Sequence, residues 1–195
     1  MIELSVLVVD DEEGMRAGAS RCLESHRFTI PETGDEVSFS MTTAADGKSA
    51  LSILEKNGTD LVLLDHKLPD ISGLDILDRL KSMKRVPLVI MITAYASIDV
   101  AVNATKQGAF DFLAKPFTPE ELRLTVQKAA TRIGLEKNSR RLEEEKRQIR
   151  FQFISVLSHE LKSPLAAIEN YLMIMRDRIL GDELDKIGRA SCRER

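Results

Sequence analysis

The sequence Leu4-Ser5-Val6-Leu7-Val8-Val9-Asp10-Asp11 has the length and composition of a buried β-strand that ends in two carboxylates. A second apolar run, residues 61–64, also ends at a carboxylate, Asp65. Uninterrupted apolar strands are typical of parallel sheets that helices cover on both faces. The two runs therefore predict an α/β domain with carboxylates gathered at one edge of its sheet.

The first 130 residues continue this alternation of short apolar runs and amphipathic stretches. Strands are predicted at residues 4–9, 37–42, 61–64, 88–92 and 110–114. Helices are predicted at residues 12–25, 47–56, 74–82, 98–107 and 119–132. This order indicates a doubly wound, five-stranded parallel sheet. The long connection at residues 28–36 is predicted to be a surface loop.

Composition limits the possible partners. The 195 residues suffice for one full domain and part of a second. The net charge of −3 gives no basic character for binding nucleic acid. No apolar run approaches the ~18 residues of a membrane span, and the start has no signal-peptide features. Two cysteines, Cys22 and Cys192, fit a reducing compartment, so we predict a cytoplasmic protein.

The character of the chain changes after about residue 130. Ten of the fifteen residues at 136–150 are charged. Apolar residues recur every seven positions, as on one edge of a coiled coil, at Leu135, Leu142, Ile149 and Val156. A solvated helix remains an alternative, because the companion positions are mostly polar. Apolar density rises over residues 151–180, which predicts a long amphipathic helix.

Four predicted strands end in polar residues, which should meet at one edge of the sheet. These residues are Asp10 and Asp11, Asp65, Thr93, and Lys115. Crowded carboxylates repel unless a hard cation such as Mg²⁺ lies among them. An aspartate held there could attack phosphorus as a nucleophile, while the lysine and threonine stabilise the transferring group.

Each of these residues also has a purely structural interpretation. Asp11 could cap the following helix, and Asp65 could begin a turn. Lys115 could be an ordinary surface lysine. The combination at four strand ends favours the chemical interpretation.

Residues 3–128 closely resemble the receiver domain of bacterial response regulators. The resemblance rests on Val8-Val9-Asp10-Asp11-Glu12, Asp65-x-x-Leu68-Pro69-x-x-x-Gly73, Ile92-Thr93-Ala94-Tyr95 and Lys115-Pro116-Phe117. It implies a flavodoxin-like receiver fold, Asp65 as phosphoacceptor, and a cis Lys115–Pro116 bond.

The resemblance also implies roles for the neighbouring residues. Asp10, Asp11, Asp65 and the backbone carbonyl of Lys67 would hold Mg²⁺, and Thr93 and Lys115 would contact the phosphoryl group. Phe112 would be an aromatic switch that turns inward when Thr93 moves, although a core aromatic is equally compatible with the sequence. His66 stands where the family usually has an apolar residue. Lys67 and Tyr95 are predicted to shield the phosphoryl group from water.

A second motif lies in the C-terminal part. Ser158-His159-Glu160-Leu161-Lys162-Ser163-Pro164-Leu165 resembles the phosphoacceptor box of sensor histidine kinases. The resemblance implies that His159 accepts a phosphoryl group with Glu160 as general base, and that the helix forms a homodimer. Pro164 is expected to bend the helix. A lone histidine on a solvated helix is the alternative interpretation.

These motifs predict four segments. They are a receiver domain at residues 1–130, a charged helical linker at 131–150, the first helix of the kinase hairpin at 151–186, and a tail at 187–195. The tail resembles a translated sequencing adapter, so we expect the natural gene to continue past about residue 186. No Gly-rich nucleotide motif is present in the sequence, so ATP would bind only to a catalytic domain outside it.

The favoured function is two-component phosphorelay signalling, with a histidine kinase or phosphotransfer protein as the phosphodonor. A receiver used only for dimerisation or docking is the alternative. A hydrolase with an aspartyl nucleophile is disfavoured, because Lys67 stands where the second acid would be.

Overall fold

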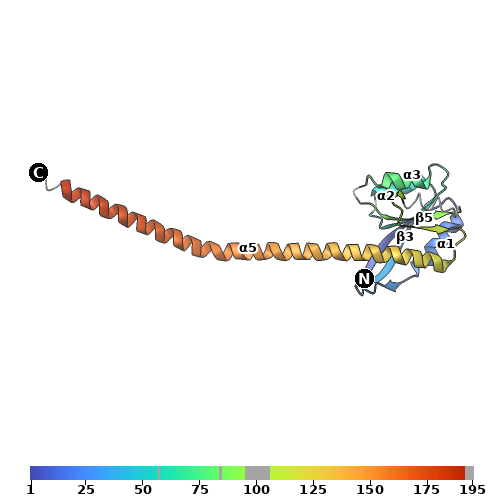
Figure 1. The fold of residues 1–195 in the computed structure, drawn as a ribbon, viewed down its shortest axis with the longest axis horizontal. Coiled ribbons are helices and arrows are strands. Elements are labelled where there is room, and N and C mark those ends of the chain that lie inside the picture. The colour runs from blue at the N-terminus through green and yellow to red at the C-terminus, as the bar shows by residue number, and fades with distance from the viewer. Residues whose placement is uncertain (57, 84, 95–105, 192–195) are drawn as a thin grey trace. The chain divides into compact units, whose positions relative to one another are not determined.

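The computed structural model describes residues 1–56, 58–83, 85–94 and 106–191 (Figure 1). Side chains are described up to residue 176. Its elements are β1 (Ile2–Val9), α1 (Glu13–Glu24), β2 (Phe28–Thr29), β3 (Glu36–Ala44), α2 (Gly47–Lys56), β4 (Leu61–Asp65), α3 (Gly73–Leu80), β5 (Leu88–Thr93), β6 (Asp111–Ala114) and α5 (Pro119–Ser191). The predicted helix at 98–107 lies outside the described residues, except for its last two positions. The alternation of strands and helices confirms the predicted α/β class.

The sheet has six strands in the order β2-β3-β1-β4-β5-β6. The pairs β1–β3, β1–β4, β4–β5 and β5–β6 are parallel, so β1 and β4 lie in its centre. Parallel strands carry their carboxyl ends at the same edge. This topology brings the ends of β1, β4, β5 and β6 together, as the sequence predicted.

The sixth strand, β2, corrects the prediction of five strands and of a loop over residues 28–36. It pairs antiparallel with the start of β3 through Phe28 and Thr29. Phe28 stacks on Phe39 of β3, with ring centroids 6.4 Å apart, and Ile30 is fully buried. Apolar side chains therefore hold the start of this connection against the sheet edge, where its length alone had indicated a loop.

Two apolar layers cover the faces of the sheet. Along β1, Leu4, Val6 and Val8 belong to one cluster, whereas Leu7 and Val9 belong to the other. The first cluster packs against α1 and α5, and the second against α2 and α3. The alternation follows from the two-residue period of a β-strand. Both layers consist of buried apolar side chains, so polar chemistry is expected at the sheet edges.

The contacts divide the chain into two compact units, residues 1–140 and 141–195. In the first unit, α5 is part of the fold well past its first turns. Ile133 is buried, and a side chain at Gly134 would collide with Ile30. Lys137 pairs with Asp60 at 2.8 Å. The helix is therefore packed against the sheet for more than four turns.

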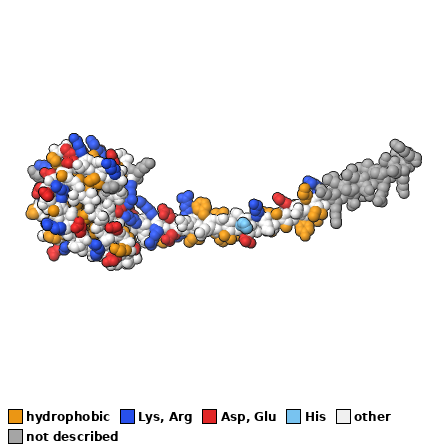
Figure 2. All heavy atoms as spheres, turned by 180° about the vertical axis from the view of Figure 1, so that it is seen from behind, with side chains coloured by type: hydrophobic (Ala, Val, Ile, Leu, Met, Phe, Trp, Pro, Cys, Tyr) orange, Lys and Arg blue, Asp and Glu red, His pale blue; other side chains and the backbone are white. Residues whose placement is uncertain are grey.

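The second unit consists of the C-terminal part of α5, which continues through Pro164 to Ser191. The described side chains in this unit are exposed, including many large apolar ones (Figure 2). Three of the four heptad positions, Leu142, Ile149 and Val156, are among them. Among the described helices, none combines the length and the hydropathy needed to cross a membrane.

Candidate functional site

The carboxyl ends of the strands hold the predicted residues together around one cavity. Its volume is about 200 Å³. The lining residues are Asp11, Glu12, Asp65, His66, Lys67, Thr93, Ala94 and Lys115. Asp10 lies beneath it and is almost fully buried.

Three carboxylates crowd this site. Oxygen atoms of Asp10, Asp11 and Asp65 lie within 4.8 Å of one another. Asp10 and Asp65 are buried, whereas Asp11 is exposed. Charges of the same sign at such distances repel strongly when water is excluded. The cluster therefore needs a compensating cation.

Lys115 supplies part of this compensation. Its Nζ lies 2.8 Å from Asp10 Oδ2 and 2.9 Å from Asp65 Oδ2, and its side chain is only 14% exposed. Burial by itself would lower the pKa of Lys115, but its close contacts with the carboxylates of Asp10 and Asp65 outweigh burial and raise it. The lysine is therefore a fixed positive charge between two carboxylates, not the surface lysine of the alternative interpretation.

The donor set fits a hard divalent cation. Asp10 Oδ1 accepts a hydrogen bond from the backbone N–H of Glu12 at 2.9 Å. Asp10 Oδ2 is buried, and no donor among the described residues is aligned with it for a hydrogen bond, although Lys115 lies close enough for an ion pair. With the exposed carboxylate of Asp11 and the nearby Asp65, this gives oxygen ligands of the kind that Mg²⁺ binds.

The loop after β4 is fixed by backbone contacts. The N–H of His66 donates to Ile92 at 2.8 Å, and the N–H of Gly73 donates to the carbonyl of His66 at 3.0 Å. A side chain at Gly73 would collide with the carbonyl oxygen of Asp65. Only glycine permits this close approach, which explains the glycine eight residues after Asp65. The N–H of Lys67 donates to Asp65 Oδ1 at 3.3 Å.

The ends of β5 and β6 are joined in the same way. The N–H of Lys115 donates to the carbonyl of Thr93 at 2.7 Å, and Thr93 is buried. The Lys115–Pro116 peptide bond is cis, as the resemblance implied. This pairing places the threonine and the lysine on the same side of the acidic cluster.

Comparison with known proteins agrees with this geometry. Residues 6–127 match the response regulator receiver domain, and residues 149–193 match the His Kinase A (phospho-acceptor) domain. The chain belongs to the response regulator receiver family. Its receiver domain is followed by a histidine kinase phosphoacceptor segment, so the chain is a component of two-component signalling.

Several characterised relatives share the receiver domain. Sporulation initiation phosphotransferase F of Bacillus subtilis is 34% identical over 128 residues, which cover 66% of this chain and 94% of that protein. Regulatory protein AtoC of Escherichia coli is 34% identical over 137 residues, or 70% of this chain and 27% of that protein. AlgB, an alginate biosynthesis regulator of Pseudomonas aeruginosa, is matched over 31% of its length. The chain thus spans about a quarter to a third of the last two relatives.

Solved receiver domains have the same fold. A CheY-like receiver domain protein from Methanospirillum hungatei has a TM-score of 0.59 at 25% identity, over 69% of this chain and 99% of that one. The BeF3-activated DrrB receiver domain has a TM-score of 0.55 at 26% identity, over 66% of this chain and 98% of that one. These likenesses support the flavodoxin-like fold of the receiver.

The structure tests the alternative interpretations of single receiver residues. The N-cap of α1 is Glu12, so Asp11 does not cap this helix. Asp65 does accept a turn hydrogen bond from Lys67, in addition to its place in the cluster. Phe112 is 42% exposed, which excludes the core-aromatic alternative. Tyr95 lies outside the described residues, so its predicted shielding role stays a prediction.

Sequence reasoning missed the contacts of three cationic side chains in the receiver, at two places in the fold. Arg16 of α1 donates to the carbonyl oxygens of Asp10 at 2.7 Å and Asp11 at 2.9 Å. At the opposite sheet edge, Asp60 pairs with Arg85 at 2.6 Å and Lys137 at 2.8 Å. Asp60 itself could have been noticed in the sequence, because it comes directly before a buried strand. Its partners Arg85 and Lys137 could not, because they lie 25 and 77 residues away along the chain and belong to no recognisable motif.

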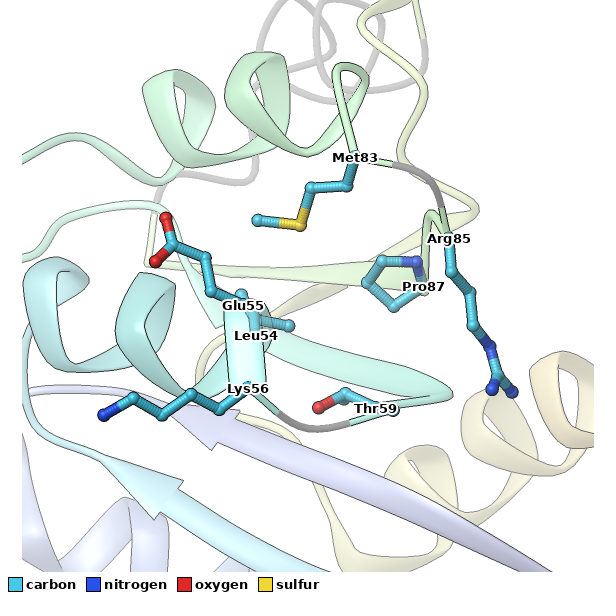
Figure 3. Close-up of a pocket in the computed structure, with 8 residues that line it drawn as sticks. Leu54, Glu55, Lys56, Thr59, Met83, Arg85 and Pro87 are labelled. Atoms are coloured by element: carbon cyan, nitrogen blue, oxygen red, sulfur yellow. The ribbon is translucent and has the colours of Figure 1, made fainter.

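A larger hollow, of about 410 Å³, lies near the sheet edge at which Asp60 is found (Figure 3). The end of α2 borders it with Leu54, Glu55 and Lys56, and Met83 and Arg85 lie across from them. Thr59 and Pro87, which also line it, precede β4 and β5, so the hollow lies away from the acidic cluster. It contains no group of carboxylates, so its size alone does not make it the functional site.

The second predicted phosphoacceptor lies in the other unit. His159 and Glu160 occupy consecutive, exposed positions of α5. An exposed imidazole is accessible to a phosphodonor. The helix assignment continues through Pro164, and the proline does not end the helix.

Proposed function

We propose that the receiver accepts a phosphoryl group on Asp65 in a reaction that requires Mg²⁺. The observation that carries this proposal is the charge arrangement: of three carboxylates within 4.8 Å of one another, Asp10 and Asp65 both pair with Lys115, whose side chain is 14% exposed. A merely structural cluster would be expected to pair each buried charge. Instead, the site keeps negative oxygens available for a cation and a nucleophile.

In this proposal each residue has a defined role. Asp10 and Asp11, with an oxygen of Asp65 and the carbonyl of Lys67, hold Mg²⁺, which when bound offsets negative charge on the phosphoryl oxygens. The free carboxylate oxygen of Asp65 forms a bond to phosphorus as the bond from phosphorus to the donor imidazole nitrogen breaks. The proton needed by that leaving nitrogen comes from the donor's own site or from water.

Lys115 and Thr93 act on the transferred group. The ammonium of Lys115 already lies 2.9 Å from Asp65, so it can contact a phosphoryl oxygen with little movement. The hydroxyl of Thr93 lies on the same side and can donate to a second oxygen. Movement of Thr93 toward the phosphoryl group would leave room for Phe112, now exposed, to turn inward.

We further propose that His159 is a phosphoacceptor of a sensor kinase core, with Glu160 as general base. Attack by a neutral imidazole nitrogen on the γ-phosphorus of ATP would break the bond to ADP, and the other ring nitrogen would release its proton toward Glu160. The ATP-binding catalytic domain would act in cis or in trans. The match of residues 149–193 to the phospho-acceptor domain supports this role.

The proposed segments are the receiver at 1–130, the linker at 131–150, the phosphoacceptor helix at 151–186 and the tail at 187–195.

The exposed apolar positions of α5 support a homodimer through this helix. The absence of Leu142 and Ile149 from any buried contact in the described chain fits a seam with a second copy. Light scattering of wild type and Ile149→Glu tests this: the variant should be monomeric. We also propose that the relay works in the cytoplasm, which the low cysteine content supports.

Intact mass spectrometry after incubation with Mg²⁺ and acetyl phosphate tests the receiver proposal. We expect one phosphoryl adduct, which is absent in Asp65→Asn and without Mg²⁺. Asp60→Asn is a matched control, because it changes the buried aspartate at the other end of the same strand. A folded wild-type chain without an adduct would favour the docking-module alternative, and continuous phosphate release would favour a hydrolase.

A further inference from the structure

Arg16 contacts the acidic segment in an unusual way. Arg16 contacts the carbonyl oxygens of three successive residues, Asp10, Asp11 and Glu12, and the Glu12 carbonyl also accepts from the N–H of Met15. The guanidinium Nη1 donates to Asp10 at 2.7 Å and to Asp11 at 2.9 Å. The backbone N–H of Arg16 donates to Glu12 at 3.1 Å. The segment that carries two proposed metal ligands is thus tied to the first turn of α1.

Helix stability does not account for this arginine. Arg16 is the fourth residue of α1, where the helix dipole disfavours a positive charge. The N-cap, Glu12, makes no side-chain capping bond that would offset this cost. The two contacts with the carbonyl oxygens are therefore the local reason for a cation at this position.

The contact matters most for Asp11. The carboxylate of Asp10 is buried and held by Glu12 N–H and by Lys115. The side chain of Asp11 is exposed, so its direction depends on how its backbone is held. The guanidinium fixes the peptide that follows Asp11 relative to the one that follows Asp10.

We propose that Arg16 is a positioning residue for the metal site: it holds Asp10 and Asp11 so that both carboxylates reach one divalent cation. This inference rests on the proposed Mg²⁺-dependent function and deepens it. Arg16 touches neither the cation nor the phosphoryl group. It acts through the backbone of the two ligands, as outer-shell partners of metal sites do.

Removing Arg16 would remove both a positive charge and the contacts that hold the ligands, and these two losses have opposite expected effects on Mg²⁺ binding. A positive charge near a cation site weakens cation binding, so its loss alone would strengthen binding of Mg²⁺. Loss of the positioning contacts would weaken binding, by roughly tenfold to a hundredfold for outer-shell partners. The sign of the change therefore separates the two effects.

The test is calorimetric titration of the full chain with MgCl₂, for wild type, Arg16→Met, Arg16→Lys and Arg21→Met. Arg21 is the matched control, because it is an exposed arginine in the last turn of the same helix. We expect Arg16→Met to weaken Mg²⁺ binding by roughly tenfold or more, Arg16→Lys to weaken it less, and Arg21→Met to match wild type. Circular dichroism and the thermal midpoint without Mg²⁺ report whether each variant is folded.

Unchanged or tighter binding in folded Arg16→Met overturns the inference and leaves the proposed function intact. If Arg16→Met does not fold, Arg16→Lys decides, because it keeps the charge and loses the planar fork: weaker binding supports the inference and equal binding overturns it. No Mg²⁺ binding by the wild-type chain overturns both the inference and the proposed metal requirement.

Discussion

Strand β4 carries a buried aspartate near each end, and the two differ in how their charges are matched. Asp60, at the amino end, accepts from the N–H of Ser5 and pairs with Arg85 at 2.6 Å and Lys137 at 2.8 Å. Asp65, at the carboxyl end, shares Lys115 with Asp10 and lies beside Asp11. Asp60 thus pairs with two cations, whereas one cation, Lys115, pairs with both Asp10 and Asp65 in a cluster of three carboxylates.

We propose that this difference separates a structural carboxylate, Asp60, from a reactive one, Asp65. Burial alone does not distinguish the two aspartates, because each is less than a tenth exposed. A fully paired buried charge is held in place and has little capacity to bind anything else. A cluster with excess negative charge gains from binding a cation, and its unmatched oxygens can act as ligands or as a nucleophile.

The largest effect should come from binding of the proposed Mg²⁺. Mg²⁺ at about a hundred times its dissociation constant should raise the free energy of unfolding by about 2.7 kcal/mol. Asp11→Asn should remove most of this gain, because it removes a ligand, and Asp60→Asn should retain it. Urea unfolding with and without Mg²⁺ measures the gain. Equal gains in wild type and Asp11→Asn would contradict the proposed site.

Replacing Asp60 or Asp65 by asparagine in metal-free buffer tests whether the two ends of β4 differ in charge matching. Asp60→Asn should lower the free energy of unfolding by about 2 kcal/mol, because it removes charge-assisted hydrogen bonds from three donors. Asp65→Asn should raise it slightly, because it relieves repulsion with Asp10 and Asp11. Chemical denaturation followed by circular dichroism measures both. If the free energy of unfolding changed with the same sign in both variants, the proposed difference between Asp60 and Asp65 would be wrong.

A smaller effect is expected when only one cation of Asp60 is removed. Lys137→Met should lower the free energy of unfolding by about 1 kcal/mol, since Arg85 still pairs with the carboxylate. Lys128→Met is the matched control on an exposed position of the same helix, and it should change stability by less than about 0.5 kcal/mol. Equal losses in the two variants would mean that the pair with Asp60 does not hold α5.

The smallest predicted effect is the pH response of Lys115. Its pKa is raised from 10.5 in the folded protein, because the contacts with Asp10 and Asp65 outweigh burial. Its stabilising contribution is therefore complete below about pH 10.5 and is lost as pH rises through the folded pKa. Carbon-13 NMR titration of lysine side chains should find a smaller shift in Asp65→Asn and an unchanged one in Asp60→Asn. A Lys115 pKa that does not respond to Asp65→Asn would show that the two residues do not interact.

The sequence was sufficient to predict much of the fold and the site for physical reasons. Buried parallel strands require uninterrupted apolar runs, and polar residues at their ends are easily recognised. The sequence therefore predicts that Asp10, Asp65, Thr93 and Lys115 lie together. The bounds of α2 were also predicted correctly, from Gly47 to Lys56.

The parts that sequence could not predict depend on contacts between distant segments. β2 has only two residues, and its place depends on stacking of Phe28 with Phe39. The cations of Asp60 come from a loop and from α5, and no spacing rule links them to the strand. Arg16 resembles any helix arginine until its contacts with the acidic segment are seen. Such contacts arise from tertiary packing, which local patterns do not encode.

We propose that phosphate attaches to Asp65, at the carboxyl end of β4, and not to Asp60, at its amino end. After incubation with acetyl phosphate and Mg²⁺, borohydride reduces an aspartyl phosphate to homoserine, and peptide mass spectrometry locates it. We expect homoserine at position 65 and unmodified aspartate at position 60. Homoserine at position 60, or none at position 65 in a chain that is folded and binds Mg²⁺, would contradict it.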